Sequence, residues 1–300
     1  MTVPILEVKG ISKTFGKVKA LDSVDFYLQK GVVHGLLGEN GAGKSSLMNV
    51  LSGIYIPEQG TIKIQNKKIE RLNPELASSL GIGMVHQEFR LIENFTIKDN
   101  LTLSKANIFL ENFKEAYLKY SEIFSLNSSY NTLVKDLSVG EKQKVEIMKL
   151  IFKNSAIMLL DEPTAVLTPQ ETSQLKISLE TLSKEDEKTI VLITHKLKEI
   201  KDFTETIFVM KNGKMVAENL QTDEVSDKHL IELMMGEIKT MSFKKDNLKG
   251  ETKLEVQNIS LINNDEVNVL KDISFKIKSG EILGVAGVSG NGQVELSNVI

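Results

Sequence analysis

The chain of 300 residues contains no cysteine. This absence excludes a disulfide framework and a metal site built from thiolates, and it is compatible with a reducing compartment. A strong excess of one charge is also missing, since the formal net charge at pH 7 is only −3. Proteins that bind nucleic acid usually carry a basic surface, so we expect no nucleic-acid partner.

Long apolar runs are missing as well. No segment approaches the roughly 18 apolar residues of a membrane-spanning helix, and Met1 to Lys9 lacks the apolar core of a signal peptide. Apolar residues make up 41% of the chain and charged residues 26%, which is typical of a soluble globular protein. We therefore expect any attachment to a membrane to depend on a partner protein.

An internal repeat organises the chain. Leu6-Glu7-Val8 recurs as Leu254-Glu255-Val256, and Gly38 recurs as Gly287 at nearly the same offset. The residues between the two copies are charged and include few large apolar side chains, which favours a linker. We therefore expect three parts: a first domain at 1–240, a linker at 241–253, and the truncated beginning of a second copy at 254–300.

Short apolar runs alternate with helical patterns in the first domain. The runs at 32–37, 157–160 and 190–193 predict an α/β fold with a mostly parallel sheet that is covered on both faces. From about 91 to 150 the pattern becomes helical, which predicts an inserted helical subdomain. Its aromatic residues recur at spacings of three and four, so we expect a buried stripe; the alternative is a docking surface for a partner helix. These residues are Phe109, Phe113, Tyr117, Tyr120 and Phe124.

A glycine-rich segment follows the first apolar run. Residues 38–45 read Gly-Glu-Asn-Gly-Ala-Gly-Lys-Ser, which matches the phosphate-binding pattern G-x-x-x-x-G-K-[ST] between a strand and a helix. Its glycines let successive backbone N–H groups face one anion, and the helix N-terminus adds partial positive charge. We expect Lys44 to contact the β- and γ-phosphates of ATP and Ser45 to bind Mg²⁺. The expected nucleotide-binding residues are Gly38, Glu39, Asn40, Gly41, Ala42, Gly43, Lys44, Ser45 and Ser46.

Two carboxylates follow the apolar run at 157–160. Acids that end a buried strand lie at the carboxyl edge of the sheet, where open α/β folds bind ligands. We expect Asp161 to hold Mg²⁺, mostly through water, and Glu162 to polarise the attacking water of a hydrolysis reaction. Taken alone, an Asp-Glu pair is more often a solvated turn.

A phosphate loop alone does not distinguish kinases, GTPases and ATPases. A third motif, Leu-Ser-Val-Gly-Glu-Lys-Gln at 137–143, helps to distinguish them. Ser138 and Gly140 open a helix, where a hydroxyl and backbone N–H groups can form a second anion site; taken alone, they predict an ordinary helix cap. The order GENGAGKS, Gln87, LSVGEKQ, LLDEPT and His195 resembles the ABC transporter ATPase family over nearly all of residues 1–240.

The resemblance implies a P-loop NTPase (RecA-like) core with an antiparallel β subdomain and an inserted helical subdomain. It implies that Phe15 stacks on adenine, that Gln87 reaches Mg²⁺ and the attacking water, and that His195 contacts the γ-phosphate. Without the resemblance, a core phenylalanine and a merely packed histidine are the alternatives. The resemblance further implies that Ser138 and Gly140 cover ATP on a second ABC domain, which is supplied in trans or by the complete chain.

The second copy departs from the phosphate-loop pattern. Gln293 stands where lysine belongs and Val294 where a hydroxyl residue belongs, so this second site is expected to be catalytically impaired. Tandem cassettes of this kind resemble importers of simple sugars and nucleosides, and the stretch Gly287 to Gln293 resembles the nucleoside branch.

That resemblance implies an ATP-hydrolysing subunit of an importer, peripheral on the cytoplasmic face of the cell membrane. Its implied partners are transmembrane permease subunits and a substrate-binding protein or lipoprotein, and its implied cofactors are ATP and Mg²⁺. The alternatives are a soluble ABC ATPase without a role in transport and an ATP-binding fragment without turnover.

Overall fold

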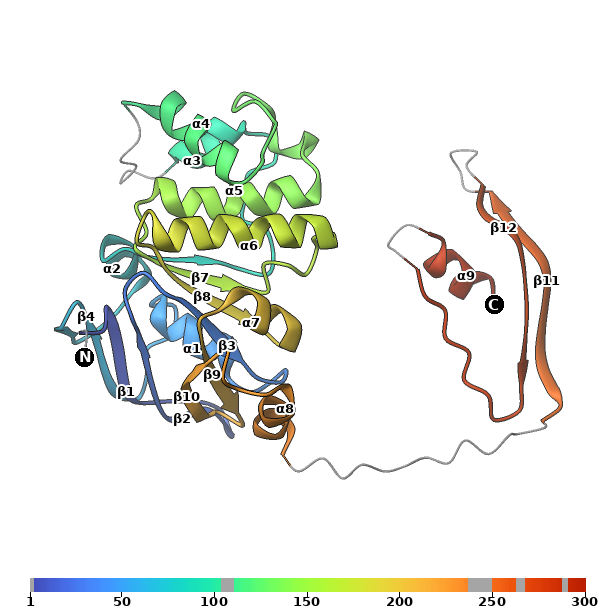
Figure 1. The fold of residues 1–300 in the computed structure, drawn as a ribbon, viewed down its shortest axis with the longest axis horizontal. Coiled ribbons are helices and arrows are strands. Elements are labelled where there is room, and N and C mark those ends of the chain that lie inside the picture. The colour runs from blue at the N-terminus through green and yellow to red at the C-terminus, as the bar shows by residue number, and fades with distance from the viewer. Residues whose placement is uncertain (1–2, 104–110, 237–249, 263–267, 288–290) are drawn as a thin grey trace. The chain divides into compact units, whose positions relative to one another are not determined.

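The computed structural model describes residues 3–103, 111–236, 250–262, 268–287 and 291–300. The chain divides into two compact units, Met1–Ile238 and Lys239–Ile300. Figure 1 labels the helices and strands of both units. None of the helices within the described ranges is long and apolar enough to cross a membrane.

A sheet of six strands forms the centre of the first unit, counted within the described residues. Its order is β10-β9-β3-β8-β7-β6, with β10 antiparallel to β9 and the other neighbours parallel. The strands are β3 (Val33–Leu37), β6 (Ile82–Val85), β7 (Ile157–Asp161), β8 (Thr189–Thr194), β9 (Thr206–Lys211) and β10 (Lys214–Gln221). All residues of β3 and β8 are buried, as expected for parallel strands covered on both faces. The predicted apolar runs thus form β3, β7 and β8, which confirms the α/β prediction.

A second, antiparallel sheet shares a hydrophobic core with one face of the central sheet. Phe26, Leu47 and Leu159 belong to this one buried cluster, although they come from the second sheet, the helix α1 and the strand β7. The four strands found in the described residues have the order β2-β1-β4-β5. The elements are β1 (Leu6–Phe15), β2 (Val18–Leu28), α1 (Lys44–Leu51), β4 (Gln59–Ile64) and β5 (Lys67–Ile69).

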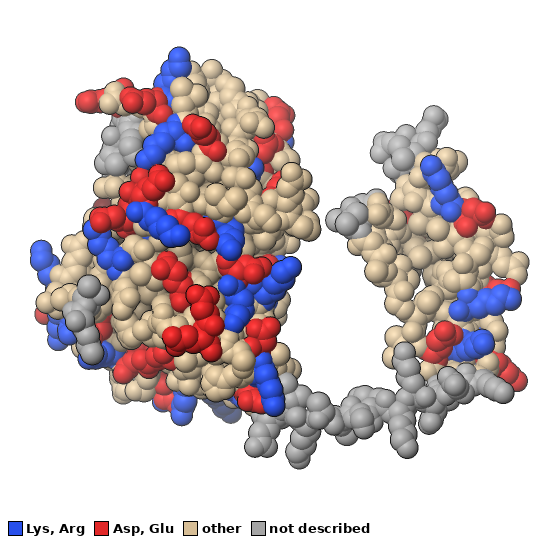
Figure 2. Space-filling view, viewed as in Figure 1, with Lys and Arg blue, Asp and Glu red and all other residues tan. Residues whose placement is uncertain are grey.

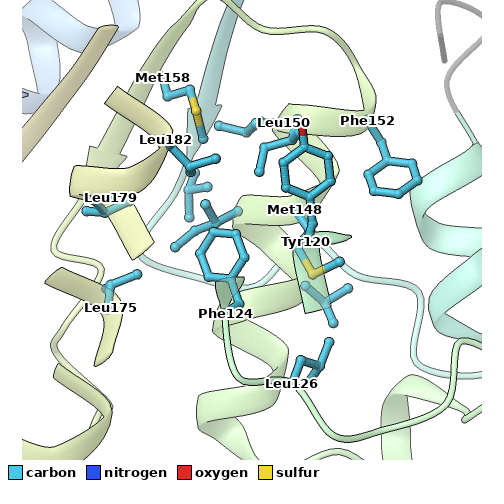
Figure 3. Close-up of a cluster of buried hydrophobic side chains, with 14 of the residues drawn as sticks. Tyr120, Phe124, Leu126, Met148, Leu150, Phe152, Met158, Leu175, Leu179 and Leu182 are labelled. Carbon is cyan, nitrogen blue, oxygen red and sulfur yellow. The ribbon is translucent and has the colours of Figure 1, made fainter. Parts of the chain in front are cut away.

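Helices cover the opposite face of the central sheet. Met158 and Leu160, which alternate with Leu159 along β7, pack with Leu179 of α6 and Met148 of α5 in a second buried cluster. Figure 3 labels Met158, Leu179 and Met148 in this cluster. Because strand side chains alternate between faces, this pattern assigns the two clusters to the two sides of one sheet. The helices are α3 (Ile97–Thr102), α4 (Phe113–Ile123), the 3-10 helix η1 (Val134–Asp136), α5 (Val139–Phe152) and α6 (Pro169–Lys184).

The predicted aromatic stripe lies in this second cluster. Phe113, Tyr117, Tyr120 and Phe124 are at most 8% exposed, so the core interpretation is confirmed for these four residues. Phe109 lies outside the described residues. The predicted helical subdomain at about 91–150 contains α3, α4, η1 and most of α5, and shares its apolar cluster with the sheet.

Three further helices complete the described part of the first unit. They are α2 (Pro74–Ser79), α7 (Leu197–Phe203) and α8 (Asp227–Met235). Ile200 of α7 and Leu230 of α8 pack with Leu37 and Val209 at the end of the sheet near β9. On the face of this unit shown in Figure 2, acidic and basic side chains are intermixed.

The second unit repeats the opening of the first in its backbone. It contains β11 (Thr252–Ile262), β12 (Asn268–Lys278) and α9 (Gln293–Val299). Val256 pairs with Phe275 as Val8 pairs with Phe26, and α9 begins after a left-handed glycine, Gly292, as α1 does after Gly43. The residues that correspond to β3 are largely exposed here; Ile282 is 97% exposed.

His34 on β3 is a buried titratable group that depends on the fold. Its Nε2 lies 3.0 Å from the Gln29 backbone nitrogen and 3.2 Å from the Gln29 carbonyl oxygen, and its Nδ1 lies 2.7 Å from the Thr206 hydroxyl oxygen. Burial lowers the pKa of His34 from 6.5 to about 4. Between these values the unfolded chain binds a proton that the folded chain does not, so stability increases with pH through this window and then levels off.

We predict that the free energy of unfolding falls as the pH decreases from about 6.5 to about 4, with His34 contributing up to about 3 kcal/mol of this loss. Urea unfolding at several pH values, for the unchanged chain and for His34→Gln, measures this contribution. The glutamine variant should show a shallower dependence on pH in this window. Identical slopes for the two proteins would contradict the prediction.

Candidate functional site

A cavity of about 450 Å³ lies where the phosphate-loop segment meets the carboxyl ends of the central strands. Parallel strands bring the residues that follow them to one edge of a sheet, which explains why distant motifs meet here. Nine of the residues predicted from the sequence line it: Asn40, Gly41, Gly43, Lys44, Ser45, Ser46, Gln87, Asp161 and Glu162.

Within the described residues, Lys44 is one of the two lysines that line this cavity, with Lys19. Lys44 begins α1 and is only 7% exposed, and its ammonium group donates to the carbonyl oxygens of Gly38 at 2.7 Å and Glu39 at 3.0 Å. Burial lowers the pKa of Lys44, while the carboxylates of Glu162 and Asp161 oppose this shift. A cation held in this way is placed to bind an anion that enters the cavity.

Close backbone contacts fix the loop that carries Lys44. A Cβ atom on Gly38 would lie 2.5 Å from the Met210 carbonyl oxygen, and one on Gly43 would lie 2.6 Å from the Ala20 carbonyl oxygen. Gly43 also has a φ of +104°, a conformation that side chains disfavour. The glycines therefore let the loop lie directly on the backbones of β2 and β9.

Asp161 and Ser45 both line the wall of the cavity. Burial and the neighbouring Glu162 raise the pKa of Asp161, whereas Lys44 and Ser45 act in the opposite direction. A hydroxyl and a carboxylate supply two hard oxygen ligands, which suits Mg²⁺ because this ion usually completes its shell with water and substrate phosphates. These two residues thus fit the predicted Mg²⁺ site.

Glu162 and His195 form a hydrogen-bonded pair. His195 Nδ1–H donates to Glu162 Oε1 at 2.6 Å. Glu162 lies at φ +47°, which is uncommon for residues other than glycine, and its backbone N–H donates to the Ile193 carbonyl oxygen at 2.9 Å. His195 lies outside the set of lining residues, so the structure brings it to the site through Glu162.

The remaining predicted residues lie at different distances from the cavity. Gly38 and Glu39 accept hydrogen bonds from Lys44 through their carbonyl oxygens. Ala42, in the same loop, is buried. Phe15 is 41% exposed and lies outside the lining, although it pairs across the β1–β2 turn with Val18, which does line the cavity.

Ser138 and Gly140 lie outside this cavity as well. Ser138 caps α5, accepting from the Glu141 backbone N–H at 3.2 Å, while Glu141 accepts from Ser138 N–H at 2.9 Å. Gly140 approaches α6 so closely that a Cβ atom would lie 2.1 Å from Glu171 Oε1. Glu171 belongs to the capping box of α6, where it accepts from Thr168 N–H at 2.9 Å. The structure therefore gives Gly140 a packing role that the motif alone did not predict.

Sequence reasoning missed five residues that line the cavity: Val18, Lys19, Ala20, Asn212 and Gly213. Asn212 and Gly213 form the two-residue turn between β9 and β10, both with positive φ. An Asn-Gly pair between two apolar runs does predict such a hairpin. Its contact with the loop, where Gly213 N–H donates to the Ala42 carbonyl oxygen at 2.9 Å, could not be read from the pattern.

Comparison with known proteins relates the chain to a family. The family model described as ABC transporter matches residues 21–165. The crystal structure of the ADP conformation of MJ1267, an ATP-binding cassette of an ABC transporter, superposes with a TM-score of 0.69 at 28% identity, covering 79% of this chain and all of that one. The predictions of the family and of the cassette fold are thus confirmed.

Curated relatives match both units of the chain. The nucleoside import ATP-binding protein NupA of Lactococcus lactis is 38% identical over 99% of this chain. The galactose/methyl galactoside import ATP-binding protein MglA of Clostridium perfringens is 41% identical over 97% of it. The chain spans 59% and 56% of the lengths of these two relatives.

We predict that the methyl group of Gly140→Ala displaces Glu171 from the cap of α6, which removes about 1 kcal/mol of capping stability and leaves a smaller net destabilisation. Within a helix, alanine is otherwise favoured over glycine by roughly 0.5–1 kcal/mol. In a Glu171→Ala background the same change should therefore be neutral or stabilising. Urea unfolding of the four proteins of this double-mutant cycle measures the coupling; equal costs in both backgrounds would show that the contact with Glu171 has no effect.

Proposed function

We propose, from the premise that this chain carries an ATP-binding domain of the ABC transporter family, that it binds and hydrolyses Mg-ATP to energise an importer. The observation that carries the proposal is the meeting of Lys44, Asp161 and Glu162 in one cavity. A cation for phosphate, an oxygen ligand for Mg²⁺ and a carboxylate beside them are the groups that ATP hydrolysis requires.

In this proposal, residues of different charge have different roles. Lys44 and the N–H groups of the loop bind the phosphates, and Ser45 and Asp161 hold Mg²⁺, which when bound would neutralise phosphate charge. Glu162 accepts a proton from the attacking water, and His195 holds the carboxylate in place through its 2.6 Å hydrogen bond. Gln87, which lines the same cavity, is placed to orient the water.

A second cassette completes the site in this proposal. Ser138 caps the N-terminus of α5, where it exchanges hydrogen bonds with Glu141, and it lies outside the cavity of its own unit. It would therefore serve ATP bound by another ABC domain. That domain is supplied by a second copy of the chain or by further sequence of a longer protein.

The proposed cargo is a nucleoside or a simple sugar, with nucleosides favoured by the stretch Gly287 to Gln293. The relatives are named for the import of nucleosides and of galactosides, at similar identity. The proposed place of action is the cytoplasmic face of the cell membrane, where the chain would be a peripheral subunit beside a permease and a substrate-binding protein.

A groove beside the cavity is the proposed docking site for the permease. It has a volume of about 500 Å³ and is lined from α2, β6, α5 and the loops around them. His86 lines this groove, whereas the next residue, Gln87, lines the nucleotide cavity, so one short segment contacts both. Arg90, Lys149 and Lys153 also line the groove, where Glu146 is the acidic residue, and this charge favours an acidic permease segment.

We predict that the purified chain hydrolyses ATP, and that Glu162→Gln lowers turnover about 10²- to 10⁴-fold, because the proton acceptor is lost. ATP binding should persist in this variant. Steady-state phosphate release and equilibrium binding, with Glu185→Gln on the exposed end of α6 as the control, measure both properties.

Specific activity that rises with protein concentration would show that two copies pair. ATP binding without turnover in the unchanged chain would favour the alternative that the chain is an ATP-binding fragment without hydrolytic activity. Wild-type turnover in Glu162→Gln, or no ATP binding at all, would contradict the proposed mechanism.

We predict that Arg90→Glu abolishes co-purification of a multi-span permease with the tagged chain from its native membranes, since it reverses charge in the groove. ATP binding should stay unchanged. Lys114→Glu, an exposed lysine of α4 outside the groove, is the matched control and should retain the permease. Equal recovery of the permease with both variants would exclude this groove as the docking site.

A further inference from the structure

Phe15 is held by neighbours from outside its own strand. It is the last residue of β1, and its ring lies in an edge-to-face arrangement with Tyr55, with centroids 5.0 Å apart and an interplanar angle of 65°. Such a pair of rings contributes roughly 0.5–1.5 kcal/mol beyond the burial of apolar area. The exposed fraction of Phe15, 41%, leaves part of the ring accessible.

Tyr55 connects Phe15 to the helix that carries the phosphate loop. It follows α1 by four residues, and its backbone N–H donates to the carbonyl oxygen of Asn49 within α1 at 2.9 Å. The ring of Tyr55 packs on the cluster that also contains Leu47 and Leu51 of α1. Lys44 begins the same helix, so the contacts of Tyr55 connect Phe15 to the helix that carries this lysine.

Lys13 and Glu58 support the ring as well. The ammonium group of Lys13 lies 5.5 Å from the centroid of the Phe15 ring, within the range of a cation–π contact, and 3.4 Å from Glu58 Oε1. The same oxygen accepts the Thr14 backbone N–H at 3.0 Å, and Glu58 N–H donates to the Ser12 carbonyl oxygen at 2.9 Å. Tyr55 and Glu58 therefore contact the end of β1 through an aromatic contact, an ion pair and two hydrogen bonds, one of them between backbone groups.

We propose that Tyr55 is a positioning residue for nucleotide-base recognition, which sets Phe15 as a stacking platform at a fixed distance from the phosphate loop, with Lys13 and Glu58 as supports. This inference rests on the proposed binding of ATP. Tyr55 acts through Phe15 and does not contact the phosphates. Loss of its ring should therefore weaken the recognition of the base and leave the recognition of the phosphates unchanged.

The test compares ATP with inorganic tripolyphosphate, which has the phosphates and lacks the base. Tyr55→Leu should weaken the binding of Mg-ATP about threefold to tenfold, the effect of losing one aromatic pair, and leave the affinity for tripolyphosphate within error. Tyr55→Phe keeps the ring and should bind ATP as the unchanged chain does. Calorimetric titration of the purified chain gives the affinities, and urea unfolding shows that each variant is folded.

A double-mutant cycle separates positioning through Phe15 from a general effect on the fold. In a Phe15→Leu background, Tyr55→Leu should cause no further loss of ATP affinity. Additive losses, equal losses for ATP and tripolyphosphate, or no loss in Tyr55→Leu would overturn the proposal while leaving ATP binding intact. Failure of the unchanged chain to bind either ligand would overturn the proposed function itself.

Discussion

The site depends on the direct contact of backbone with backbone below the phosphate loop. Residues 38–43 lie against the carbonyl oxygens of Ala20 and Met210 at distances that exclude a Cβ atom on Gly38 or Gly43. This contact ties the loop to the antiparallel sheet through β2 and to the central sheet through β9. The position of Lys44, and with it the position of any bound phosphate, is therefore set by both sheets together.

Charges of opposite sign lie together next to this loop. Lys44 is buried beside Asp161 and Glu162, and burial alone would disfavour the charged forms of Lys44 and Asp161. Each sign stabilises the other, so removal of one partner would leave an uncompensated charge in a partly buried cavity. The hydrogen bond from His195 adds a further constraint on Glu162, whose backbone already lies in a strained region.

The sequence was sufficient for the parts of the site that follow from local chemistry. The apolar runs that became β3, β7 and β8 are periodic and buried, and the loop at 38–45 lies between a strand and a helix as its pattern requires. Contacts between distant residues were not predictable in this way. Gly140 approaches Glu171, and Gly213 approaches Ala42, because separate elements pack together. Such packing produces no recurring pattern of residues in the sequence.

The two buried clusters on the faces of the central sheet also limit how a structural change at one site could affect another site in the first unit. Helices α4, α5 and α6 share one apolar cluster with β7 and β8, so α5, whose N-cap is the exposed Ser138, is packed onto the sheet that carries Asp161. Close-packed clusters resist internal sliding, because a shift leaves voids or clashes. The segment after β6 differs: His86 and Gln87 lie on a loop between the groove and the cavity, and Gln87 is exposed. A partner in the groove can therefore influence the nucleotide through this loop without repacking either core.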